Sequence, residues 1–403
     1  MRDVVFLTYA YPPLRYPRSI QIYRLVKYSR HRIRVVCAEP EPERDDSIDE
    51  RLSGRPAEQI VVQRPRGRFE WPRLTRRFAV PDAYRGWARA AADRILRDRL
   101  ITADDTLVTF GNPMSDHVAG LEIRRALGVR WVAHFSDPWA DNPYRRLPPI
   151  ARRIDRRLER DVIAGADRVV FTTAETVDLV MAKYPPAWRA KTLVLPHAFD
   201  PELFDGGPVE RTAGRPGILG RHIGSLYVHR KPDPLTQALW RLGREQPGLL
   251  AGVRIELVGH VASAIETAAP APATHDAVVR FAPRVDYRSS IRLMRESDFL
   301  LVIDAPFDRS VFLPSKLIEY VGAARPILAI TPPGAAAALV RRLGGFVADA
   351  RDMDAVADQL RAMLSFVRGR RARTFGEPAV RAEFAAPKIV ADFDAIIDEL
   401  SRC

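Results

Sequence analysis

The stretch Leu313–Ile330, with the sequence LPSKLIEYVGAARPILAI, decides the fold class of this 403-residue chain. Pro314 suits the first turn of a helix, and the Ser315 side chain is expected to cap its free amides. Apolar residues then recur at helical spacing, at Leu317, Ile318 and Val321. The helix ends before Pro326, and the apolar run Ile327–Ile330 is typical of a buried parallel strand. The pattern predicts an α/β fold with parallel sheets.

The start of this helix has the chemistry of an anion site. Its first amides have no partner within the helix, and the helix dipole also favours negative charge there. Glu319 lies one turn along, and its carboxylate can accept two hydrogen bonds from ribose hydroxyls. We therefore predict a nucleoside diphosphate site, with phosphates at Pro314, Ser315 and Lys316 and the ribose at Glu319.

These residues also carry a family resemblance. The run resembles the donor-nucleotide motif of the retaining glycosyltransferases of family 4. The resemblance extends over most of the chain, to Tyr11-Pro12-Pro13, Asp137-Pro138-Trp139, Gly224–Tyr227 and Arg280–Asp298. The family motif has two glutamates separated by seven residues; Glu319 matches the second, whereas Val311 stands at the first. We interpret Val311 as a subfamily trait that removes the usual contact to the donor sugar.

The resemblance implies the GT-B fold, in which two Rossmann-like domains face each other across a cleft and the last helix returns to the first domain. We expect an acceptor-binding domain at 1–205 and a donor domain at 218–375, with 376–403 as the returning helix. The Gly- and Pro-rich run 206–217 is the expected linker. The implied activity is a hexosyltransferase reaction: a sugar moves from a nucleotide-diphosphate donor to an acceptor hydroxyl with retention, in bacterial surface polysaccharide or glycolipid synthesis.

The expected donor contacts come from three segments of the second domain. A strand ends in the turn at Gly224 and Ser225, and the resemblance places a basic pair against the diphosphate, matched by Arg230 and Lys231 with an offset of about one residue. Two cations can compensate the charge of a departing diphosphate without a metal. Arg284 and Val285 occupy the turn at which the family contacts the base. A solvated basic pair is the alternative for Arg230 and Lys231.

The first domain offers polar residues where predicted strands end, which is where ligands bind in open α/β sheets. We expect acceptor contacts from Tyr11, Arg18, Asn112 and His117. Arg18 stands where the family has a Gly-Gly pair, and it could instead face water. His117 could equally be structural.

The loop His134-Phe135-Ser136-Asp137-Pro138-Trp139 follows another predicted strand. The resemblance implies that it supplies the polar group of the catalytic region. Asp137 is our main candidate, near the acceptor hydroxyl or the donor sugar, and a cap of the next turn is its alternative. His134 is a second candidate, although strand alternation could bury it.

The chain is strongly basic, with 63 Lys and Arg against 50 Asp and Glu, a net charge of +13. It lacks an aromatic-studded RNA motif and a helix-turn-helix signature, so we expect no nucleic-acid partner. An anionic membrane surface with a lipid-linked or sugar acceptor fits better than composition bias alone. Two segments favour it: 64–78, with six arginines and three aromatics, and a helix with an apolar face and an arginine face. The apolar face is formed by Ile150, Ile154, Leu158 and Val162.

No apolar run approaches the roughly 20 residues of a spanning helix. The N-terminus enters a strand at once, and the two cysteines form neither a disulfide framework nor a zinc pattern. We expect a cytoplasmic protein, peripheral on the inner face of the plasma membrane, that uses no metal and no cofactor apart from the donor itself.

Two other functions remain open. A sugar-nucleotide epimerase shares the architecture but needs several acidic groups in its cleft, and the sequence shows no such cluster. A non-catalytic nucleotide-sugar-binding homologue is suggested by Val311 and by the missing Gly-Gly pair.

Overall fold

The protein is described from a computed structural model. The structure describes residues 3–40, 44–48, 56–64, 79–207, 217–227, 229–261, 279–369 and 374–402. Most of the basic segment 64–78 and of the expected linker 206–217 therefore lies outside the described residues. The chain divides into two compact units. Unit 1 comprises Met1–His197 and Ala386–Cys403, and unit 2 comprises Ala198–Ala385.

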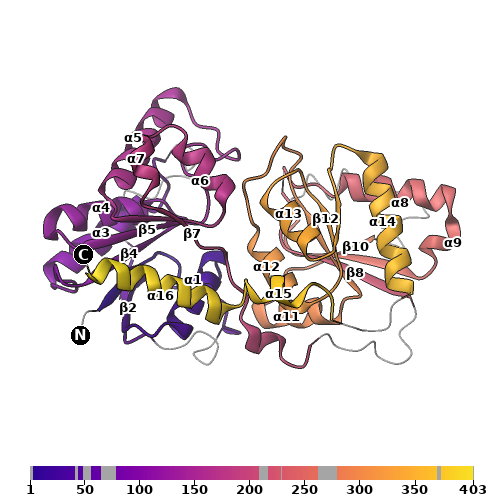
Figure 1. The fold of residues 1–403 in the computed structure, drawn as a ribbon, viewed down its shortest axis with the longest axis horizontal. Helices are drawn as coiled ribbons and strands as arrows, with labels where there is room; N and C mark the ends of the chain where they lie inside the picture. Colours follow the sequence, from indigo (N-terminus) through magenta and orange to yellow (C-terminus); the bar gives the residue numbers. More distant parts are fainter. Residues whose placement is uncertain are drawn as a thin grey trace. The chain divides into compact units, whose positions relative to one another are not determined.

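Strands and helices alternate along both units (Figure 1). The strands of unit 1 are β1 (Val4–Leu7), β2 (Ile33–Ala38), β3 (Glu58–Val62), β4 (Thr106–Gly111), β5 (Arg130–Phe135), β6 (Arg168–Phe171) and β7 (Thr192–Val194). Its helices are α1 (Pro17–Tyr28), α3 (Arg85–Arg97), α4 (Ser115–Leu127), α5 (Pro149–Gly165), α6 (Ala174–Met181), α7 (Pro186–Arg189) and α16 (Ala386–Arg402).

Unit 2 begins with the short 3-10 helix η2 (Pro201–Phe204). Its strands are β8 (Ile218–Ile223), β9 (Val253–Val258), β10 (Val279–Ala282), β11 (Phe299–Ile303), β12 (Ile327–Ile330) and β13 (Phe346–Ala348). Its helices are α8 (Asp233–Glu245), α9 (Pro247–Leu250), α11 (Tyr287–Glu296), α12 (Ser315–Ala323), α13 (Ala335–Arg342), α14 (Met353–Arg368) and α15 (Pro378–Ala382).

Unit 1 is built on a parallel sheet in the order β3-β2-β1-β4-β5-β6-β7. Successive side chains of a strand point to opposite faces, so each face must be covered. Leu7 joins the core formed with α3, α4 and α5, whereas the Phe6 ring lies 5.8 Å from the Phe393 ring of α16 on the other face.

Unit 2 repeats the plan with the order β10-β9-β8-β11-β12-β13. Leu301 and Ile303 pack against α8 and α14, and Leu300 and Val302 pack against α11, α12 and α13. In both units the strand order reverses beside a central strand, β1 or β8, as in Rossmann-like sheets. The expected pair of Rossmann-like domains is confirmed.

The last helix of the chain belongs to unit 1, as predicted for the returning helix. It packs along α1, and Asp394 accepts hydrogen bonds from the Ser29 hydroxyl at 2.5 Å and the Arg30 amide at 3.0 Å. Arg30 also pairs with Asp398. These contacts join segments at the two ends of the chain.

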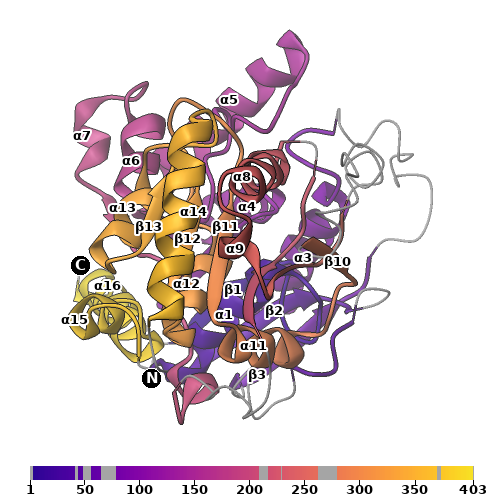
Figure 2. The ribbon, with the colours of Figure 1, turned by 90° about the vertical axis from the view of Figure 1, so that its right-hand side faces the viewer.

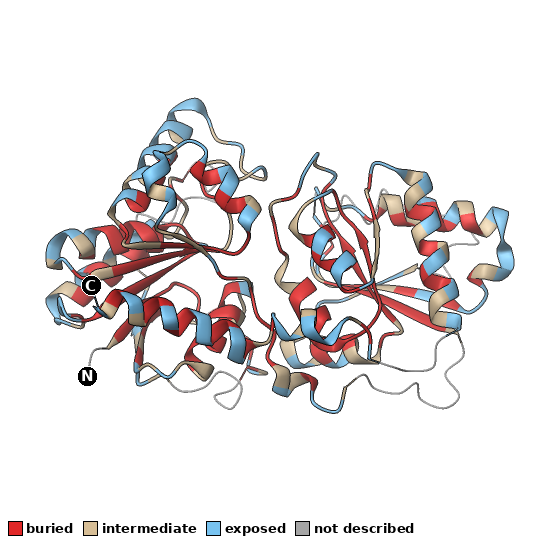
Figure 3. Cartoon of the chain, in the orientation of Figure 1, coloured by how far each residue is buried: buried red, intermediate tan, exposed pale blue. Residues whose placement is uncertain are grey.

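Helix α5 buries only the C-terminal part of its predicted apolar face, at Val162. Ile150 and Ile154 are 77% and 44% exposed, and Figure 3 shows this end of the helix largely exposed. The buried positions of the helix are Asp155, Glu159, Val162 and Ile163. Over the first turns of α5, two carboxylates rather than the isoleucines of the apolar face therefore point into the unit.

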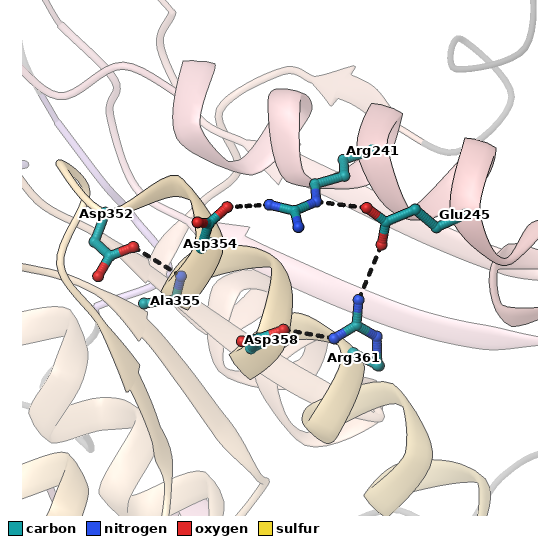
Figure 4. Close-up of polar contacts among 7 residues, drawn as sticks. All are labelled: Arg241, Glu245, Asp352, Asp354, Ala355, Asp358 and Arg361. Carbon is teal, nitrogen blue, oxygen red and sulfur yellow. Dashed lines mark hydrogen bonds and ion pairs between the residues drawn. The ribbon is translucent and has the colours of Figure 1, made fainter.

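Helices α8 and α14 lie side by side on unit 2 (Figure 2). An exposed charge network links them (Figure 4). Glu245 of α8 pairs with Arg241 on its own helix at 2.6 Å and with Arg361 of α14 at 3.1 Å, and Arg241 also pairs with Asp354. Exposed pairs of this kind each contribute little to stability, because water and salt screen them.

Candidate functional site

The strand-order reversal of unit 2 gathers polar side chains beyond the ends of β8 and β11. Gly224 follows β8 with a φ of +152°, and a Cβ on it would lie 2.9 Å from Lys316 Nζ. The positive φ favours glycine here, and the missing Cβ leaves room for the Lys316 side chain. The β8 turn and the first turn of α12 therefore meet at the edge where open α/β sheets bind ligands.

Arg230 lies on the loop between β8 and α8, and its guanidinium is held by a buried carboxylate. Its Nε donates to Asp304 Oδ1 at 3.1 Å, immediately after β11. Asp304 also accepts hydrogen bonds from the Ala305 amide and the Ser310 hydroxyl. Of the expected basic pair, Arg230 is thus anchored at this edge, whereas Lys231 is exposed.

Lys316 is the second residue of α12 and contacts a histidine that sequence reasoning missed. Its Nζ lies 3.1 Å from Nε2 of His222. Burial, followed by the charge of Arg230, holds the Lys316 pKa well below its usual range. Burial also holds the pKa of His222 well below its ordinary value, so the imidazole is neutral.

Glu319 faces inward one turn along α12 and is 5% exposed. The Tyr287 hydroxyl donates to its Oε1 at 3.2 Å. Tyr287 begins α11, directly after the turn that holds Arg284 and Val285. Arg284 is exposed, and Val285 packs against the core.

The start of α12 differs in detail from the prediction. Pro314 precedes the first helical residue, Ser315, and no side chain caps this end. Sequence reasoning expected Ser315 to act as the cap, which is wrong. Ser315 is only partly buried, and Ser225 of the β8 turn is exposed. A helix start without a side-chain cap keeps its amides available to an anion.

Unit 1 contains a buried arginine–histidine pair. Arg18, in the first turn of α1, donates from Nη2 to His134 Nδ1 at 2.7 Å and to the His134 carbonyl oxygen at 3.1 Å. The guanidinium also lies 5.3 Å from the centre of the Phe110 ring. Burial lowers the Arg18 pKa to about 10 and keeps His134 neutral, with its pKa well below the ordinary value. Because Nδ1 accepts, Nε2 carries the imidazole proton.

His117 and its neighbour Asp116 begin α4 and are fully buried. The Trp131 indole donates to Thr109 Oγ1 at 2.9 Å, and the Thr109 hydroxyl shares a hydrogen bond of 2.7 Å with His117 Nδ1. Burial lowers the His117 pKa to about 3. Among the described residues, His117 Nε2 has no hydrogen-bond partner.

Asp116 joins the ends of β1 and β4 at the strand-order reversal of unit 1. Its Oδ2 accepts the Tyr9 amide at 2.8 Å, and Oδ1 has no hydrogen-bond partner in the described part of the chain. Burial, opposed by the Tyr9 bond, raises the Asp116 pKa well above its usual value. Sequence reasoning missed this residue, although a polar residue just after a buried strand is the signal that could have found it.

The other predicted site residues of unit 1 differ in how far they are buried. Tyr11 is buried, and burial raises its pKa. Asn112 is exposed, and Asp137 is partly buried directly after β5. Ser115, the first residue of α4, donates its amide and hydroxyl to Asp82, at 3.0 and 2.6 Å. Asp82 therefore satisfies the first amide of α4 from a distant segment of unit 1.

We predict that Asp116→Asn changes the pH dependence of stability. The folded-state pKa of Asp116 is raised, so this group binds more proton in the native than in the unfolded state, and its contribution to wild-type stability falls as pH rises above about 4. Asparagine cannot ionise. The unfolding free energy of the variant relative to wild type should therefore increase with pH, by up to about 1 kcal/mol per pH unit.

Thermal denaturation between mildly acidic and mildly alkaline pH measures this difference. Glu122→Gln, an exposed substitution on the same helix, is the matched control and should run parallel to wild type. Parallel curves for Asp116→Asn and wild type would show that the buried carboxyl group titrates normally.

Part of this sequence matches a known family, and the fold resembles solved structures. Residues 21–197 match a family model described as a glycosyl transferase 4-like domain. This match lies within unit 1 and covers less than half of the chain. No curated protein sequence matches the chain.

Three solved structures resemble it over nearly their whole length. Sucrose-phosphate synthase from Thermosynechococcus elongatus is 15% identical with a TM-score of 0.72, covering 99% of each chain. Trehalose 6-phosphate synthase from Burkholderia multivorans is 13% identical with a TM-score of 0.71, covering 100% of this chain and 99% of that one. Anabaena Alr3699/HepE, solved in complex with UDP, is 14% identical with a TM-score of 0.61, covering 98% and 100%.

At such identities the structural likeness shows the fold, which is the GT-B type expected from the sequence. Together with the family match, it supports a glycosyltransferase. Among the described residues, no group of three or more His, Cys, Asp or Glu side chains is placed to hold a metal ion. None of the described helices combines the length and apolar character needed to cross a bilayer.

Proposed function

We propose that the chain transfers a hexose from a nucleoside diphosphate donor to an acceptor hydroxyl, with retention of anomeric configuration, and that unit 2 binds the donor. The observation that carries the proposal is the convergence on one sheet edge of Lys316, Arg230 and the uncapped start of α12. Cations and free amides at such an edge favour a diphosphate. HepE, which has the same fold, was solved with UDP.

The donor contacts follow from this geometry. The diphosphate lies at the amides of Ser315 and Lys316, and Glu319 accepts hydrogen bonds from the ribose. Arg230 and Lys316 stabilise the negative charge that develops on the departing diphosphate. These two cations take the place of a metal ion, and no cofactor besides the donor enters the reaction.

Unit 1 supplies the acceptor side in this proposal. The end of β5 is surrounded by Arg18, His134 and Asp137. The ends of β1 and β4 are followed by Tyr11, Asn112 and His117. The neutral His134 offers its Nε2–H to an oxygen of the acceptor. The departing phosphate accepts the proton of the attacking hydroxyl, so the reaction needs no carboxylate nucleophile.

A screen of nucleotide sugars tests this function. We expect one nucleotide sugar to raise the thermal denaturation temperature, and nucleoside diphosphate release to increase when sugar or lipid-linked acceptors are added. Interconversion of the donor sugar without transfer would instead indicate an epimerase. Binding without turnover against a broad acceptor panel would indicate a non-catalytic homologue.

We further propose that unit 1 binds an anionic membrane surface, as an enzyme of surface polysaccharide or glycolipid synthesis would, on the inner face of the plasma membrane. The exposed face of α5 supports this. Ile150, Arg153, Ile154 and Arg157 recur at helical spacing and are all exposed. Isoleucines flanked by arginines suit the boundary between headgroups and acyl chains.

Replacing both Ile150 and Ile154 by serine should reduce co-sedimentation with phosphatidylglycerol vesicles by roughly tenfold or more, because two apolar side chains no longer enter the bilayer. Trp240→Ser, which removes an exposed apolar side chain from unit 2, is the matched control. Equal co-sedimentation of the double variant and wild type would exclude α5 as the docking face.

A further inference from the structure

The contact between Lys316 and His222 fixes how each group holds its proton. His222 is fully buried near the end of β8, and its Nδ1 lies 3.0 Å from the carbonyl oxygen of Leu301 on β11. A carbonyl oxygen only accepts hydrogen bonds, so Nδ1 carries the imidazole proton. Nε2 therefore has a free lone pair, and it accepts the hydrogen bond from Lys316 Nζ at 3.1 Å.

The charges facing Lys316 oppose one another in the absence of ligand, because Arg230 disfavours an ammonium ion there and Asp304 favours it. Arg230, on the loop after β8, is cationic, and Asp304, after β11, is already paired with it. Glu319 lies one turn along the same helix. Among the described residues, no carboxylate oxygen lies within 4.0 Å of Lys316 Nζ. Its only recorded hydrogen-bond partner there is the neutral His222.

A diphosphate at the start of α12 would reverse this balance. It would place negative oxygens beside Nζ, and an opposite charge within about 4–6 Å favours the charged form of a lysine. The same hydrogen bond to His222 serves both forms of the lysine, because an amine and an ammonium can each donate to Nε2. No rearrangement of His222 is needed.

We propose that Lys316 rests as a neutral amine on His222 and takes up one proton from solvent when the donor diphosphate binds, releasing it when the nucleoside diphosphate leaves. The amine gains a proton to become an ammonium, and no other bond changes. This inference rests on the proposed donor site in unit 2. It adds that donor affinity is linked to pH through a single lysine.

Calorimetry in buffers of different ionisation enthalpy counts the protons taken up on binding. UDP-glucose is the first probe, because its diphosphate diester has no group that titrates near neutral pH, and ADP-glucose and GDP-mannose are the alternatives if it does not bind. For wild type we expect uptake to rise with pH, from near zero in mild acid toward about one proton per site in mild alkali.

Two variants test whether Lys316 is the group that takes up the proton. In Lys316→Arg the guanidinium is always charged, so uptake should disappear while the nucleotide sugar still binds. Lys316→Met should also lose the uptake and should bind about tenfold more weakly or worse, because a charged hydrogen bond to phosphate is lost. Lys388→Met, at an exposed lysine of α16, should behave as wild type.

The outcomes separate this inference from the function on which it rests. Binding by wild type with no proton uptake at any pH would overturn the inference and leave the transferase proposal standing. Uptake that persists in Lys316→Arg would assign the proton to another group, such as His222, and would also overturn it. If no nucleotide sugar binds, both the function and the inference fail.

Discussion

Glu319→Ala should weaken nucleotide-sugar binding by roughly 1–3 kcal/mol, or about 5- to 150-fold in Kd, because it removes charged hydrogen bonds to the ribose. The carboxylate is 5% exposed and lies one helical turn from the amides proposed to hold the phosphates. Titration calorimetry with the nucleotide sugar that binds wild type measures the change.

Controls separate lost recognition from lost structure. Tyr287→Phe deletes only the hydroxyl that donates to Glu319 and should change affinity by less than about 1 kcal/mol. Glu245→Gln, in the exposed network between α8 and α14, should leave affinity unchanged. An unaltered Kd for a folded Glu319→Ala protein would remove the ribose contact from the site.

Asp155→Ala should lower the unfolding free energy of unit 1 by about 3–5 kcal/mol. Asp155 is fully buried, accepts the Trp139 indole N–H at 3.0 Å and pairs with Arg145 at 2.7 Å. Its loss leaves a buried indole N–H and a partly buried guanidinium without their acceptor. It also releases the loop that begins at Asp137.

Chemical denaturation followed by tryptophan fluorescence tests this prediction. Asp161→Asn is the matched control on the same helix, because Asp161 is only partly buried and its pair with Arg125 spans 4.0 Å. We expect a change within about 0.5 kcal/mol for this control. Equal losses for the two variants would mean that the buried network contributes no special stability.

The fold could be predicted because local signals agreed with one another. Short apolar runs bounded by turns alternate with helical patterns, which is the arrangement of a parallel sheet covered on both faces. The stretch from Pro314 to Ile330 shows it clearly: the structure has a helix at Ser315–Ala323 and a strand at Ile327–Ile330. Here helix propensity, the hydrophobic period and the helix-breaking residues all predict the same structure.

The orientation of α5 could not be predicted, because the sequence does not show which polar groups will find partners. A period of four assigned Ile150 and Ile154 to one apolar face with Leu158 and Val162. In the structure Glu159 is buried instead, because the Ala140 amide, the Tyr184 hydroxyl and Lys183 satisfy its oxygens. These partners are distant in sequence, so the hydrophobic pattern of the helix alone does not predict them.

The candidate site was predicted only in part, because some of its residues depend on partners that are distant in sequence. Lys316 and Glu319 belong to one helix start, which is a local signal. His222 and Asp304 acquire their roles only through neighbours on other strands, Leu301 and Arg230. A strand residue such as His222 looks like any other buried position until its partners are known.

The central claim is that unit 2 binds a nucleoside diphosphate between the β8 turn and the start of α12. A crystal structure of the full chain with the nucleoside diphosphate of its best-binding sugar donor tests this most directly. We predict phosphate oxygens within hydrogen-bond distance of Lys316 Nζ and the Ser315 amide, and ribose hydroxyls at Glu319. A nucleotide bound elsewhere, with this edge of the sheet empty, would contradict the account.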